Sequence, residues 1–286
     1  MCLAAFAINA SSRWPLVLAS NRDEFFDRPA LPLTSWQTAT GHALISGRDV
    51  LAGGTWLGVT PGGRVALLTN VREPVVAKAP RSRGELTVRW LEGIDNAHRF
   101  VAGIDGALYG GFNLVMGDLT TGQWHSWSNR PDGVRARGAQ RLDDGIYGLS
   151  NAALDTPWPK TLALKAAMVD ALALNSKQSL EKALFTALSN QERAAIDQLP
   201  QTSVPPELEW ALSSARVNIA ERNYGTRCAS VLVIEASNKT SSAHNVDCTA
   251  SLTEITYPAL PATDPANHTT AQHTFNLSLK AAGWMG

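Results

Sequence analysis

Two short apolar runs at the start of the chain constrain the fold more than any other feature. Residues 2–9 read CLAAFAIN and residues 15–20 read PLVLAS, and the NASSR segment at 9–13 between them has turn composition. So short a connection predicts a β-hairpin, whose two strands run antiparallel. The first residues of one strand then lie beside the last residues of the other. We therefore expect Cys2 to lie next to residues 21–23.

A charged segment, NRDEFFDRP at 21–29, directly follows the second apolar run. Such segments are usually solvated loops, and this interpretation stays open. The alternative is a functional one that depends on the hairpin. A cation such as Arg22 beside Cys2 would lower the pKa of its thiol. Asp23 would accept a hydrogen bond from an α-ammonium group and orient it.

The rest of the chain alternates between hairpin and helix patterns. Hairpins are predicted around 61–63 and 119–122, and strands return over 226–234, 250–257 and 273–279. Ser82 and Glu85 have the spacing of a capping box, so a helix is expected there, with Arg81 and Arg83 either solvated or facing an anionic ligand. Thr156 as N-cap and Pro157 as first helical residue predict a second helix, and a third follows near 180–188. Helices grouped between hairpins favour an α+β protein with helices packed on sheets.

Composition excludes several classes of protein. In 286 residues, 25 lysines and arginines balance 25 aspartates and glutamates, so the chain lacks the basic excess of a nucleic-acid-binding protein. Three cysteines are too few for a disulfide scaffold, and we expect Cys228 and Cys248 to be unpaired packing residues. The six histidines show no metal-ligand spacing, so no metal or cofactor is expected.

The start of the chain does not have the pattern of a targeting signal. The first basic residue, Arg13, follows the first apolar run, and no apolar run reaches membrane-spanning length. No break in composition marks a domain boundary. We expect a single domain over 1–286, cytoplasmic, without an integral membrane segment, whose partner is a small molecule and not a nucleic acid.

Cys2 is notable for its position. Aminopeptidases remove an initiator methionine when a small residue follows it, which would leave Cys2 with a free α-amine. That one residue would then contain a nucleophile and a base, since an α-amine titrates near ~8 and can accept the thiol proton. The competing interpretation is an ordinary cysteine in a buried strand.

Two asparagines at predicted strand ends are candidates for stabilising an oxyanion. Asn70 ends the apolar run RVALLTN, and Asn151 follows GLS at 148–150. Side-chain amides and backbone N–H groups commonly supply the donors that acyl transfer requires. Turn capping is the alternative, because asparagine is common in turns.

The ordered blocks of this sequence resemble the NRDE family, also called the transport and Golgi organisation protein 2 family. The matching blocks are MCLAAFA, SNRDEFFDRP, GRDVLAGGTWLGV, LLTN, RSRGEL, YGGFNLV, YGLSNAALDTPWPK and YGTRCASVLVI. They cover residues 2–234, whereas the tail after 235 matches only loosely. The resemblance implies an N-terminal nucleophile hydrolase-like fold, a four-layer αββα sandwich with two antiparallel sheets between helical layers.

The family is also distantly similar to cysteine amidases such as bile-salt and penicillin V acylases. That similarity implies a site whose matching positions are Cys2, Arg22, Asp23, Asn70, Asn151 and Arg227. It suggests an N-terminal cysteine hydrolase that cleaves a linear amide other than a peptide bond through a thioester. Arg227 would hold the site or a substrate carboxylate.

A second function hypothesis is a non-catalytic carrier. Eukaryotic members of the family are associated with haem trafficking and lipid metabolism, so the ligand would be haem, an acyl-CoA or another lipid-like molecule. Trp56, Trp90, Trp124 and Trp127 would either line such a pocket or pack in the core. No haem-attachment motif is present.

Overall fold

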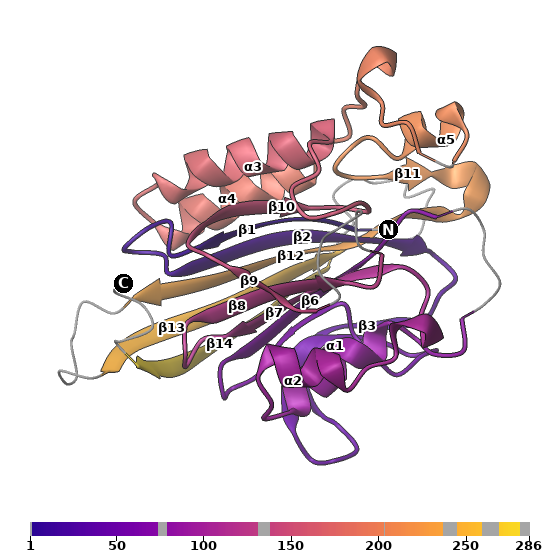
Figure 1. The fold of residues 1–286 in the computed structure, drawn as a ribbon. Helices are drawn as coiled ribbons and strands as arrows, with labels where there is room; N and C mark the ends of the chain where they lie inside the picture. The colour runs from indigo at the N-terminus through magenta and orange to yellow at the C-terminus, as the bar shows by residue number, and fades with distance from the viewer. Residues whose placement is uncertain are drawn as a thin grey trace.

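Two antiparallel sheets lie face to face in the computed structural model, which describes residues 2–73, 79–130, 138–202, 204–236, 245–258 and 269–280 (Figure 1). Within these residues the first sheet has the strand order β10-β1-β2-β12-β13-β14, with β11 paired to β12. Its strands are β1 (Cys2–Ile8), β2 (Leu16–Phe25), β10 (Gly145–Leu149), β11 (Asn218–Ile219), β12 (Tyr224–Ala236), β13 (Asn245–Thr256) and β14 (Thr269–Lys280).

The second sheet follows chain order from β3 to β9. Its strands are β3 (Ala30–Gln37), β4 (Ala43–Asp49), β5 (Leu57–Val59), β6 (Arg64–Asn70), β7 (Phe112–Asp118), β8 (Gln123–Ser128) and β9 (Gln140–Leu142). Short connections between neighbouring strands explain this simple order, because antiparallel strands need only a turn to join them.

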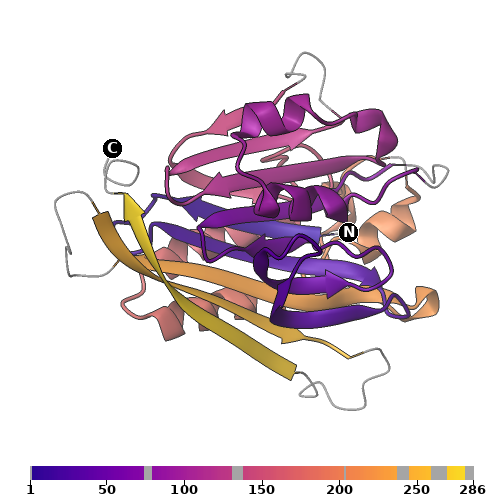
Figure 2. The same cartoon turned by 90° about the horizontal axis from the view of Figure 1, so that it is seen from below.

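Helices cover the outer face of each sheet. The helices α3 (Pro159–Leu172) and α4 (Lys177–Leu188) pack on the first sheet, and α1 (Gly84–Glu92) and α2 (Ala97–Ala102) pack on the second (Figures 1 and 2). A short α5 (Pro206–Ala211) lies beside β11. The architecture is therefore a four-layer αββα sandwich, as the resemblance implied. No helix in the described ranges is long and apolar enough to cross a membrane.

Alternation along β1 shows how the layers are held together. Ala4, Phe6 and Ile8 pack in the core between the two sheets, while the residues of opposite parity pack against α3 and α4. Successive side chains of a strand point to opposite faces, so a strand covered on both sides is apolar throughout. Residues 3–8 of β1 show this pattern, and the strand is buried along its length.

The three predicted hairpins are confirmed as β1–β2, β5–β6 and β7–β8. The helix near 180–188 is also confirmed, as α4. The strands β3 and β4 and the short strand β9 were not predicted, whereas β10 ends where the sequence analysis placed a strand end, just before Asn151. Cys228 and Cys248 are buried and pack in the core between the sheets, in agreement with the sequence analysis. All four tryptophans named above are buried, which favours core packing over pocket lining.

Both predicted helix starts are wrong in detail. Arg83, not Ser82, occupies the N-cap of α1, and its guanidinium has no acceptor with which to cap the helix. The Glu85 carboxylate, the other half of the predicted capping box, pairs with Arg81 at 2.7 Å and Tyr109 at 2.5 Å. The second helix, α3, begins at Pro159, two residues later than predicted. Trp158 is extended there, since a residue that precedes proline is disfavoured in the helical region.

Candidate functional site

Several strand ends meet at the end of the sandwich where β1 begins. Cys2 pairs with Arg22, and Arg22 pairs on its other side with Cys228 of β12. The hairpin has therefore placed Cys2 beside residues 21–23, as its short turn predicted. Asn70 at the end of β6 belongs to the facing sheet, and Asn151 follows β10. Both sheets thus contribute to one site.

Cys2 lies on the inner face of the first sheet. It has the parity of Ala4 and Phe6, which pack between the sheets, and it is 8% exposed. Burial raises the pKa of the Cys2 thiol, and the negative charge of Asp23 adds to this effect. Arg22 and a backbone hydrogen bond from Asp23 favour the thiolate and lower the same pKa. The thiol therefore needs a nearby base to lose its proton near neutral pH.

Arg22 is buried between the two sheets instead of lying in a solvated loop. Its guanidinium stacks 4.3 Å from the ring centre of Trp56, and its Nη2 lies 3.4 Å from Asp49 Oδ2. Its Nη1 is buried and has no hydrogen-bond partner within the described ranges. The solvated interpretation of this segment is therefore wrong at Arg22, because the two sheets close over it.

Asp23 lies on the opposite face of the same strand, toward the helical layer. Thr226 Oγ1 donates to Asp23 Oδ1 at 2.6 Å, and the Tyr224 hydroxyl donates to its backbone oxygen at 3.0 Å. Burial raises the pKa of the Asp23 carboxyl, while the charge of Lys160 opposes the rise. Burial lowers the pKa of Lys160 to about 8, and the charge of Asp23 opposes that change.

The two asparagines form a bridge between the sheets. Asn151 Nδ2 donates to the backbone oxygen of Asn70 at 2.9 Å and to its side-chain oxygen at 3.2 Å. The single hydroxyl proton of Ser150 is shared between two acceptors, the Cys2 backbone oxygen at 3.0 Å and Asn151 Oδ1 at 3.3 Å. A continuous set of hydrogen bonds thus links the backbone of Cys2 to Asn70. Asn151 orients Asn70 and leaves the Asn70 Nδ2 group as the donor of the pair.

Arg227 occupies a β-bulge and turns away from this network. The register between β12 and β2 shifts between Thr226 and Cys228, so Arg227 is the extra residue. Its Nη1 donates to the backbone oxygens of Phe25 and Arg28 at 2.8 and 2.9 Å. Arg227 therefore holds the loop after β2 in place.

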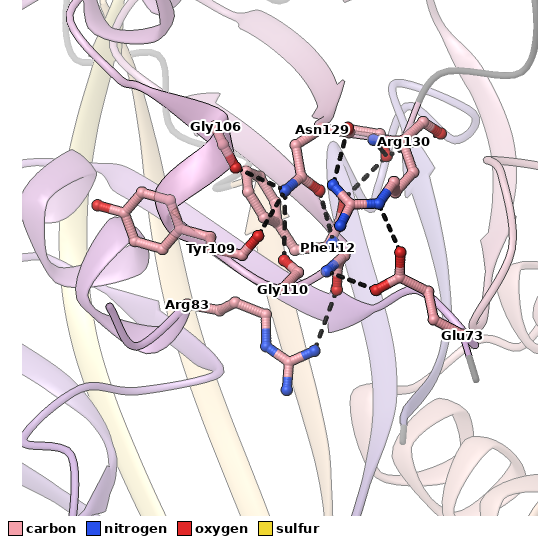
Figure 3. Close-up of polar contacts among 10 residues, drawn as sticks. Glu73, Arg83, Gly106, Tyr109, Gly110, Phe112, Asn129 and Arg130 are labelled. Atoms are coloured by element: carbon pink, nitrogen blue, oxygen red, sulfur yellow. Dashed lines mark hydrogen bonds and ion pairs between the residues drawn. The ribbon is translucent and has the colours of Figure 1, made fainter. Parts of the chain in front are cut away.

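The sequence analysis left open whether Arg83 is solvated or faces an anionic ligand. In the structure most of its side chain is buried near the site. Arg83 Nη1 donates to the Gly111 backbone oxygen at 3.0 Å (Figure 3). Burial lowers the pKa of Arg83, and the charge of a Cys2 thiolate opposes that change. Gly54 allows this placement, because a Cβ there would meet the backbone of Gly84 at 2.4 Å. No local signal predicted it.

A network around Asn129 fixes the loop before β7 (Figure 3). The Asn129 amide accepts from Phe112 N at 2.9 Å, and its Nδ2 donates to the backbone oxygens of Gly106, Tyr109 and Gly110. Glu73 then joins this loop to the segment after Asn70. It accepts from Gly111 N at 2.9 Å and from Arg130 Nε at 2.5 Å.

A pocket of about 330 Å³ adjoins the asparagine bridge. Asn151, which donates to Asn70, lies in its wall. Its lining residues are Val71, Arg72, Arg130, Asn151, Ala152, Ala153, Trp158 and Thr202. In the part of the chain that the structure describes, no three His, Cys, Asp or Glu side chains are grouped to hold a metal ion.

Sequence comparisons assign the chain to a family. The sequence model for "Transport and Golgi organisation 2" matches residues 1–245. The chain belongs to the Transport and Golgi organisation 2 family. The human "Transport and Golgi organization protein 2 homolog" is 31% identical over 258 residues, which are 82% of this chain and 89% of the human one. The homologue from Bos taurus is 30% identical over 293 residues, covering 97% of this chain and 99% of its own.

Two solved structures are similar at much lower identity. One is a Caenorhabditis elegans N-acylethanolamine-hydrolyzing acid amidase ortholog, with a TM-score of 0.45 and 12% identity over 81% of this chain and 92% of that one. The other is the C2A mutant of a conjugated bile acid hydrolase from Clostridium perfringens, with a TM-score of 0.40 and 8% identity over 96% and 97%. The family assignment rests on the sequence matches.

Proposed function

We propose that this protein is an N-terminal cysteine hydrolase that cleaves a linear, non-peptide amide C–N bond through a thioester. The observation that carries the proposal is the continuous set of hydrogen bonds from the Cys2 backbone through Ser150 and Asn151 to Asn70. It joins a potential nucleophile to a side-chain amide donor on the facing sheet. The proposal takes the domain to span 1–286 and Met1 to be removed; Met1 lies outside the described residues.

In the first step the Cys2 sulfur attacks the substrate carbonyl. The α-amine of Cys2, free after removal of Met1, takes the thiol proton directly or through water and later gives it to the leaving amine. Such a base suits a thiol whose pKa is raised by burial. The C–N bond breaks to release the amine and leave a thioester on Cys2. Water then hydrolyses the thioester to a carboxylic acid and restores the thiol.

The negative charge that develops on the carbonyl oxygen needs a positioned donor. Asn70 Nδ2 suits this role, because Asn151 already donates to both oxygens of Asn70 and holds its side chain. Arg22 and Arg83 supply positive charge on the Cys2 side of the sheet, and their charges stabilise a thiolate. Asp23 and Arg227 act as positioning residues through Thr226 and the loop after β2.

The first test is the chemical identity of the N-terminus. Intact mass and N-terminal sequencing of the untagged protein are expected to show a chain that begins at Cys2. A retained Met1 would block the α-amine base and contradict the mechanism. It would leave the non-catalytic carrier of haem or an acyl-CoA as the better account of this protein.

The second test compares two buried free cysteines that flank the same residue. Cys2 and Cys228 both pair with Arg22 in neighbouring strands, but only Cys2 begins the chain of bonds to Asn70. We expect the Cys2→Ala variant to lose all acylation by an amide or thioester probe, and Cys228→Ala to keep it. Equal labelling of Cys2→Ala and the parent, measured by intact mass, would overturn the proposal.

A further inference from the structure

The guanidinium of Arg83 is fixed beside the end of β6, next to the proposed oxyanion donor. Its Nη1 donates to the backbone oxygen of Gly111 at 3.0 Å. The same oxygen accepts at 2.9 Å from the backbone N–H of Val71, the residue that follows Asn70. Arg83 and the segment after Asn70 therefore share one acceptor, which holds the positive charge close to the end of that strand.

The backbone at the same position adjoins the other part of the site. The residue after this arginine, Gly84, accepts from the backbone N–H of Thr55 at 3.3 Å. The next residue along that strand connection, Trp56, stacks on the guanidinium of Arg22, the strand partner of Cys2. The start of α1 is thus held against the segment that covers Arg22, and its arginine lies between the nucleophile and the oxyanion donor of the proposed mechanism.

Arg83 has no ion pair among the described residues, which sets it apart from four arginines around it. Those four pair with carboxylates as follows: Arg22 and Arg28 with Glu24 and Asp49, Arg81 with Glu85, and Arg130 with Glu73. The two carboxylates whose charges act on Arg83 are Glu24 and Glu73, so both already have another partner. One positive charge is left without a counter-ion, which favours a ligand with a single negative charge.

Two nitrogens of this guanidinium are free to bind a ligand. In the part of the chain that the structure describes, Nε and Nη2 of Arg83 have no hydrogen-bond partner. The side chain is partly exposed, and neither nitrogen is among the buried atoms that lack a partner. Nε–H and one Nη2–H point in parallel directions, which matches the two oxygens of a carboxylate. Figure 3 shows this edge on the side of the guanidinium away from the Asn129 network.

There is also room beside the guanidinium, at Gly110. A Cβ added to Gly110 would lie 4.0 Å from Arg83 Nη1 and within 4 Å of no other atom outside the adjoining residues of the described chain. The φ angle of Gly110 is not in the left-handed region, so other residues can adopt the same backbone conformation. A group of a few atoms would therefore fit next to Arg83 without displacing the protein.

We propose that Arg83 binds a carboxylate of the substrate, so that the enzyme prefers amides with a carboxylate close to the scissile bond. The word substrate rests on the hydrolase function proposed above, whereas binding of the carboxylate does not. The carboxylate can belong to the amine part of the amide, as in an N-acyl amino acid, or to its acyl part, as in a succinamic acid. Both sources offer the same two oxygens, and the experiment distinguishes them.

Binding is tested by calorimetric titration of the full-length Cys2→Ala protein, which separates binding from turnover. The probes are hexanoylglycine and N-hexylsuccinamic acid, each compared with its neutral N-methylamide. We expect one of the two acids to bind at least about tenfold more tightly than its neutral twin, because a charge-assisted bidentate contact is lost in the twin. Equal affinities within both pairs would overturn the proposal, and so would inorganic phosphate displacing the acid at lower concentration than acetate does.

Two arginines at the start of the same helix locate the binding. Arg83→Lys keeps the positive charge but removes the two-donor edge, so the preference for the acid over its twin is expected to fall about tenfold. Arg81→Lys is the matched control, because Arg81 already pairs with Glu85 at 2.7 Å, and it should keep the preference. A merely structural role of Arg83 would weaken both twins alike. Unchanged preference in Arg83→Lys, or an equal loss in Arg81→Lys, would overturn the assignment.

A second pair of variants leaves Arg83 and its bond to Gly111 in place. Gly110→Asp adds a carboxylate beside Arg83 that competes with the carboxylate of the ligand, so the preference for the acid is expected to disappear. Gly110→Asn has nearly the same size without the charge and should keep the preference. Equal preference in the two variants would overturn the assignment.

The outcome is distinguishable from failure of the hydrolase proposal. If an acid binds with the expected preference but Cys2 of the parent is never acylated, the carboxylate site stands and the catalytic proposal fails. If Cys2 is acylated by neutral and acidic amides at equal rates and neither acid shows preferred binding, the hydrolase stands and the carboxylate site fails.

Discussion

Residues 16–23 of β2 form two halves that are both buried but chemically opposite. Leu16–Ala19 is apolar, with its side chains divided between the two cores on either side of the sheet. Ser20–Asp23 continues the same strand at the same depth with polar and charged side chains. Burial alone therefore does not distinguish the structural end of the strand from the functional end.

The two halves are stabilised in different ways. The apolar half is stabilised by area removed from water, which needs no particular geometry. The polar half depends on specific partners: Asn21 Nδ2 donates to the backbone oxygens of Leu188 and Ala215 at 2.8 and 2.9 Å. Arg22 Nη1 lacks a partner among the described residues.

The largest change in the free energy of unfolding is expected in the core that the apolar half of β2 faces. Phe6, which faces the same core as Leu18, is fully buried and stacks on Tyr147 with ring centres 5.4 Å apart. Phe6→Ala should lower the free energy of unfolding by about 4 kcal/mol, through lost burial and the cavity left behind. Urea denaturation measures it. The control is Ile94→Ala, at a residue 94% exposed, where a loss comparable to that of Phe6→Ala would contradict the comparison.

A smaller change in the free energy of unfolding is expected at Thr226 of β12, whose uncharged side chain bonds to Asp23 in the polar half of β2. Thr226→Val keeps the shape of the side chain but removes the donor to Asp23 and the acceptor for Val217 N. We expect the free energy of unfolding to fall by about 2–3 kcal/mol, because two buried groups lose their partner. Labelling of Cys2 should slow as well. A variant as stable as the parent would show that this network does not hold Asp23.

The buried charge of Lys160 predicts a pH dependence. Its pKa falls from 10.5 to about 8 on folding, so between these values the unfolded chain binds more protons than the folded one. Stability contributed by this group therefore rises with pH through that window. Relative to Lys160→Met, the parent should gain about 2 kcal/mol of unfolding free energy between pH 7 and pH 10. A constant difference across this range would contradict a shifted Lys160.

The smallest effect is expected at the rim of the site. Arg28 Nε pairs with Asp49 at 2.7 Å and lies 3.7 Å from Glu24, and all three side chains are partly exposed. Arg28→Gln should lower the free energy of unfolding by only about 0.5–1 kcal/mol, because solvent screens such pairs. Adding salt should shrink the difference further. If Arg28→Gln lowered the free energy of unfolding as much as Thr226→Val, the exposed ion pairs of Arg28 would contribute as much as the buried hydrogen bonds of Thr226.

Much of the site was predictable from local sequence. The short turn after β1 placed Cys2 beside residues 21–23, among which it pairs with Arg22, and the predicted strand ends located Asn70 and Asn151. One further prediction could have been made. Successive side chains of a strand point to opposite faces, so the adjacent residues Arg22 and Asp23 had to face opposite sides of the sheet.

Other parts had no local signal. Arg72 and Glu209 form an ion pair although they are 137 positions apart, and nothing in either segment indicates the other. The strand β3 was missed because nearly all of its residues are exposed or half-buried, which resembles a loop. The strand β4 was missed because its buried part is only four residues long and includes a serine and a glycine. The helix starts were misplaced because side chains expected to cap them bond elsewhere.

The sequence by itself determined the antiparallel hairpin and the position of Cys2 beside residues 21–23, because these depend on a turn a few residues long. It also determined the family, through the order of many blocks along the chain. Only the tertiary structure decided that Asn151 donates to Asn70, that Asp23 faces Lys160, and that Arg72 borders a pocket. Those relations depend on how two sheets and their helices pack, and packing brings together residues whose separation along the chain conveys nothing about their distance in space.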